Sequence, residues 1–72
     1  MNYLAFTDES VTMMYEGIRG ALAADDALER DHRLPVFRVR ETVDWKKHGT
    51  ALEAEMLKRG MPFQLIDWFA DQ

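Results

Sequence analysis

The positively charged side chains of this 72-residue chain are concentrated in one segment. Residues 30–48 contain six of its nine Lys and Arg residues: Arg30, Arg33, Arg38, Arg40, Lys46 and Lys47. Clustered guanidinium and ammonium groups bind phosphates and other anions, and an aromatic ring such as Trp68 would add a stacking platform. The segment therefore indicates an anion-binding surface as one possible function.

The charge of the whole chain weakens the case for nucleic acid. The net charge is −4, and residues 1–29 contain six acidic residues against the single Arg19. The basic segment can therefore pair with the acidic helix of the same subunit or of a second one, or be solvated. We expect protein–protein binding, with nucleic-acid binding through residues 30–48 as the alternative.

Metal binding has little support in the residue types. The chain has no cysteine, and His32 and His48 are its only histidines, without the HxH or HExxH spacing of common metal sites. We expect no metal and no cofactor.

No residue of the sequence is an evident candidate for a catalytic nucleophile, acid or base. Ser10 is the only serine and has no nucleophile-elbow context, and the carboxylate pairs Asp25–Asp26 and Glu53–Glu55 are expected at exposed helical positions. We predict a protein that is not an enzyme, with an active site at a subunit interface as a second alternative.

A first helix is predicted to begin after Thr7. Thr7 is a suitable N-cap, and Asp8 and Glu9 follow it in the first turn, where the helix dipole favours acidic groups. An apolar stripe at helical spacing comprises Val11, Met14, Tyr15, Ile18 and Leu22. The end of this helix is left open, since Asp25 and Asp26 either stop it or start a short extra turn as a capping box.

Two strands and a second helix are predicted in the remainder. Residues 36–40 alternate between apolar and basic types, which is typical of a strand. A helix capped by Thr42 or Asp44 is expected to follow, with Gly60 ending it and Pro62 preventing its continuation. Residues 63–68 are predicted to form a second, more buried strand.

This order of elements predicts an α/β fold. A helix is followed by a strand–helix–strand unit, giving the order α-β-α-β with a right-handed crossover and a two- or three-stranded sheet. The third strand would come from residues 2–6. Residues 1–72 are expected to form a single small domain.

Small size favours self-association. A core of this length leaves only about 3–5 kcal/mol of stability without a staple, and open sheet edges invite a second copy. We therefore expect a homodimeric interaction or regulatory module in the cytoplasm, not attached to a membrane. The candidate binding residues are Arg33, Arg38, Arg40, Lys46, Lys47, Trp68 and Phe69.

Overall fold

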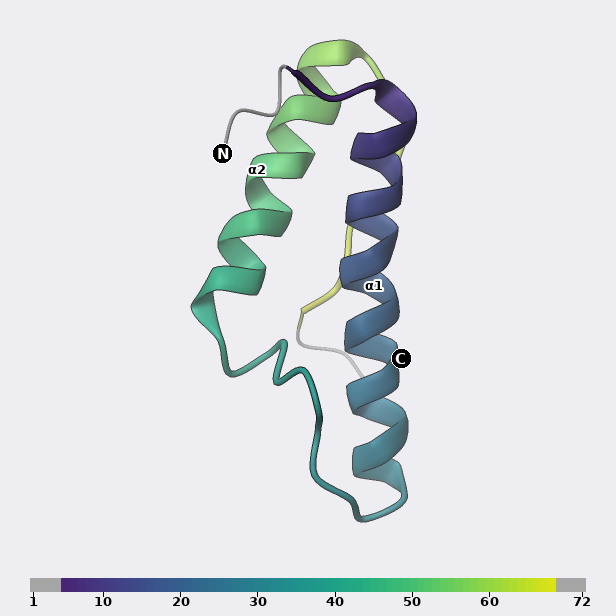
Figure 1. Ribbon diagram of the computed structural model, residues 1–72, viewed down its shortest axis with the longest axis vertical. Helices are drawn as coiled ribbons and strands as arrows, with labels where there is room; N and C mark the ends of the chain where they lie inside the picture. The colour runs from purple at the N-terminus through teal and green to yellow at the C-terminus, as the bar shows by residue number, and fades with distance from the viewer. Residues whose placement is uncertain (1–4, 69–72) are drawn as a thin grey trace.

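The computed structural model describes residues 5–68, which form a helical hairpin followed by an extended segment (Figure 1). Helix α1 spans Asp8–Arg30 and helix α2 spans Val43–Arg59. The two helices lie side by side and antiparallel, joined by a loop of residues 31–42. After α2 the C-terminal segment, residues 61–68, runs back along the hairpin.

Both helices begin where the sequence predicts. The Thr7 side chain accepts a hydrogen bond from the Ser10 backbone N–H at 3.1 Å, which satisfies one free donor at the start of α1. Thr42 is the N-cap of α2, and Gly60 ends that helix with a left-handed φ of 70°. Helix α1 continues past Asp25 and Asp26 to Arg30, so neither acidic residue stops or restarts it.

The core lies between the two helices and under the two non-helical segments. Helix α1 supplies the predicted stripe, of which Met14 is only partly buried. The loop contributes Val39, and the C-terminal segment contributes Ile66. The fully or nearly fully buried apolar residues are Val11, Tyr15, Ile18, Ala21, Leu22, Val39, Leu52, Met56 and Ile66.

The predicted α/β class is wrong. Residues 5–68 contain no strand, so the strand–helix–strand unit and its sheet do not form. Residues 36–40 belong to the loop, and residues 63–68 form an irregular extended segment. Of the possible N-terminal strand at residues 2–6, residues 2–4 lie outside the described residues, and Ala5 and Phe6 are not in a strand.

Side chains of α1 replace the hydrogen bonds that a sheet would supply. In the C-terminal segment the Ile66 N–H donates to the Tyr15 hydroxyl at 3.0 Å, and Arg19 donates to the Gln64 carbonyl. In the loop, Asp25 accepts from three backbone N–H groups. Since buried backbone groups need partners of some kind, these bonds let both segments pack without a neighbouring strand.

Tyr15 joins both helices and the C-terminal segment. Besides accepting from Ile66, its hydroxyl donates to Glu53 Oε2 of α2 at 2.6 Å, and its ring packs edge-on against Phe63 with centroids 5.7 Å apart. Burial of the hydroxyl, with a further contribution from the hydrogen bond to Glu53, raises the pKa of Tyr15 from 10.0 to about 12. The neutral side chain is therefore the form that the fold stabilises.

This shift predicts a loss of stability in alkali. The folded-state pKa is above the unfolded value. The neutral Tyr15 hydroxyl therefore makes its full contribution to the free energy of unfolding below pH 10, and this contribution falls as the pH rises to about 12. Its loss amounts to roughly 2–3 kcal/mol in total. Tyr15→Phe removes this ionisation, so the difference in unfolding free energy between wild type and variant, measured with urea, should shrink across that range. A difference that stays constant with pH would contradict the assignment.

Candidate binding site

The loop between the helices exposes apolar side chains next to arginines. Leu34, Val36 and Phe37 are 79%, 70% and 46% exposed. Arg33 and Arg38 flank them in the chain and are also exposed. We call these five residues the loop surface. Neighbouring exposed apolar side chains bordered by charged groups are typical of surfaces that bind another molecule.

The backbone of the loop surface is held by one buried carboxylate. Asp25, which is 3% exposed, accepts hydrogen bonds from Val36 N and Phe37 N at Oδ1, at 3.1 and 2.9 Å, and from Val39 N at Oδ2, at 2.9 Å. Val39 itself is buried in the core. The loop is therefore fixed both by these bonds and by an apolar anchor.

Arg38 lies at the point where the loop turns between two of these donors. Its φ is 54°, in the left-handed region, which costs a non-glycine residue about 1 kcal/mol. Its carbonyl accepts from the N–H groups of Glu41 and Thr42, at 3.1 and 3.0 Å. The neighbouring bonds to Asp25 hold this conformation, and the exposed Arg38 side chain pairs with Glu41 Oε2 at 3.5 Å.

Asp26 and Arg40 connect the loop to the C-terminal segment. The Arg40 guanidinium pairs with both carboxylate oxygens of Asp26, a residue only 2% exposed. Arg40 Nε also donates to the Trp68 carbonyl at 2.8 Å. Two adjacent carboxylates of α1 thus organise the two segments that pack beside it. The sequence-based expectation that Asp25 and Asp26 are exposed is wrong.

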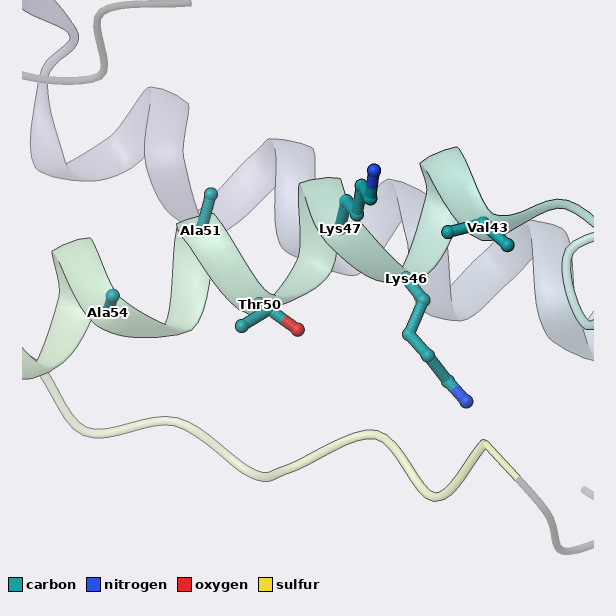
Figure 2. Close-up of a pocket in the computed structure, with 6 residues that line it drawn as sticks. All are labelled: Val43, Lys46, Lys47, Thr50, Ala51 and Ala54. Carbon is teal, nitrogen blue, oxygen red and sulfur yellow. The ribbon is translucent and has the colours of Figure 1, made fainter.

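The predicted binding residues lie in three different places. Arg33 and Arg38 belong to the loop surface, whereas Arg40 joins the loop to Trp68. The Trp68 ring lies against Gly49 of α2, where a Cβ atom would come within 2.8 Å of ring atom Cζ2. Lys46 and Lys47 line an open cavity on α2, on its side away from α1 (Figure 2). Phe69 lies outside the described residues.

Sequence reasoning missed the apolar residues of the loop surface and the two aspartates that position it. The alternation in residues 36–40 suggested a strand, which hid the exposure of Val36 and Phe37. A signal for Asp25 was present, since it follows Leu22 by three residues and so continues the apolar stripe of α1. An acidic residue on a core-facing stripe indicates a buried carboxylate, which needs hydrogen-bond donors around it.

Asp25→Asn should destabilise the fold by about 2 kcal/mol, because an amide nitrogen cannot accept from a backbone N–H and one buried donor loses its partner. Asp31→Asn is the matched control, since Asp31 is exposed in the loop. It should change the unfolding free energy by less than about 0.5 kcal/mol. Urea unfolding measures both. Equal stability of Asp25→Asn and wild type would show that the Asp25 bonds do not hold the loop.

Comparisons with protein-family models, curated proteins and solved structures find no match to this chain. Neither helix is long and apolar enough to cross a membrane, as judged over residues 5–68. Over the same residues, no three His, Asp or Glu side chains gather as a metal site would require. The candidate site that the geometry of the chain supports is the loop surface, because its apolar side chains are exposed on a loop that Asp25 holds.

Proposed function

We propose that this chain is a non-enzymatic binding module that recognises another protein through the loop surface. The observation that carries the proposal is the exposure of Leu34, Val36 and Phe37 on a loop whose backbone Asp25 holds from Val36 to Val39. A rigid loop loses little conformational entropy when it binds, so more of the contact free energy appears as affinity. The proposal places this module in the cytoplasm, in agreement with a chain that has no cysteine.

The side chains of the loop surface indicate the chemistry of the partner. Leu34 and Val36 would each contribute roughly 1–2 kcal/mol if fully buried in an apolar pocket. Arg33 and Arg38 would sit at the rim of that pocket, where carboxylates complement them. We therefore expect the partner to present an apolar depression bordered by Asp or Glu side chains.

The same features favour protein over nucleic acid as the ligand. Leu34 and Val36 are aliphatic, and the one ring of the loop surface, Phe37, already packs edge-on against Trp45 with centroids 6.1 Å apart. The net charge of −4 opposes approach to a polyanion. Of the basic residues first considered, Arg40 is engaged with the buried Asp26.

Selection from a library of random peptides tests this proposal. The immobilised full-length chain should enrich peptides that combine large apolar residues with Asp or Glu, and Leu34→Ser/Val36→Ser should lose at least about tenfold in affinity for them. This variant leaves the packing of Phe37 against Trp45 in place.

The matched control is Met13→Ser/Leu65→Ser, which removes two apolar side chains elsewhere that are also mostly exposed (67% and 66%) and should bind like wild type. Equal losses in both variants, or no enrichment, would contradict the proposal. Retardation of single-stranded DNA at low salt, abolished by Arg33→Ala/Arg38→Ala, would favour the nucleic-acid alternative instead.

A further inference from the structure

The face of α2 that points away from α1 has no covering element within residues 5–68. Val43 and Leu57 are 64% and 71% exposed on α2, and Thr50 and Ala54 are also exposed. Between them lies an open cavity of about 420 Å³, lined by Val43, Lys46, Lys47, Thr50, Ala51 and Ala54, all from this one helix (Figure 2). We call this the outer face of α2.

The residues of the outer face are evenly spaced on both sides of its centre at Thr50 and Ala51. Val43 precedes Thr50 by seven residues and Leu57 follows it by seven, so the three lie in one row along the helix. A neighbouring row has the same spacing, with Asp44 and Lys58 each seven residues from Ala51. The first row therefore has an apolar residue at both ends. The second row has an acidic residue at one end and a basic residue at the other.

We infer that the outer face of α2 binds the same face of a second copy of this chain, with the two helices antiparallel. A two-fold axis beside Thr50 and Ala51 sets Val43 opposite the partner's Leu57. The same axis sets Asp44 opposite the partner's Lys58. Each contact then occurs twice, and the charges at both ends of the interface are complementary.

The side chains at the centre of the face suit a close approach of two helices. Thr50, Ala51 and Ala54 are small, so the second backbone can come near without a clash. A parallel arrangement would bring Lys47 of both copies together, whereas the antiparallel one sets Lys47 beside the partner's Ala54. Because the interface uses the same patch on both copies, the assembly closes at two subunits.

This inference goes beyond the proposed function, because the outer face of α2 and the loop surface share no residue. Leu34→Ser/Val36→Ser, which tests the loop surface, should leave the dimer intact. Failure of peptide binding and failure of dimerisation are therefore separate results.

Sedimentation equilibrium of the full chain tests the dimer. Wild type should sediment at twice the 8.4 kDa mass of the chain. Thr50→Arg, which places two like charges on the axis, should sediment as a monomer. Helical circular dichroism should match wild type, because Thr50 is exposed in a single chain.

Charge exchange tests the antiparallel register. Asp44→Lys or Lys58→Asp alone should weaken the dimer about tenfold, because each puts like charges opposite one another at two places. Asp44→Lys/Lys58→Asp should recover the wild-type dissociation constant to within about threefold. Glu9→Lys is the matched control, since it makes the same reversal of charge in the first turn of α1. This variant should dimerise like wild type.

Two results would overturn the inference. One is a wild-type chain that remains monomeric up to millimolar concentration. The other is a double exchange that dimerises no better than either single variant, because opposite charges would then not meet across the axis.

Discussion

Three backbone N–H groups of the loop donate to the buried carboxylate of Asp25, and the conformation of the loop between the helices follows from this interaction. Without an acceptor, Val36, Phe37 and Val39 would lose hydrogen bonds to water as Val39 enters the core. Asp26 extends the arrangement one residue further along α1, because Arg40 binds both its carboxylate and the Trp68 carbonyl. Adjacent aspartates thus position the loop and the end of the C-terminal segment.

The helices were predictable from the sequence because their signals are local. Thr7, Gly60 and the stripe of α1 act through bonds or contacts within a few residues, and all three behave as the sequence predicts. The prediction of strands failed, because alternation in residues 36–40 says only that side chains point to opposite sides. Whether the backbone pairs with a strand or with a carboxylate depends on Asp25, eleven residues before Val36.

The distinction between local signals and contacts to distant residues applies to the candidate site as well. Composition directed attention to the segment containing Arg33 and Arg38, but the segment forms a loop, in which apolar side chains are as prominent as arginines. Arg40 has the same charge and a different role, since it pairs with a carboxylate that the sequence alone suggested was exposed. Charge clustering along the chain therefore does not distinguish an exposed arginine such as Arg33 from a structural one such as Arg40.

Amide hydrogen exchange of the loop tests the role of Asp25 at each of its three donors, because it reports on each backbone N–H separately. If Asp25 holds the loop, exchange should be slow at Val36, Phe37 and Val39. It should be fast at Arg38, whose N–H lies between two of these donors in the chain but is not bonded to Asp25. A strand would protect alternate residues instead. Protection that alternates along residues 36–40, or rapid exchange at all of them, would contradict the claim that Asp25 organises the loop.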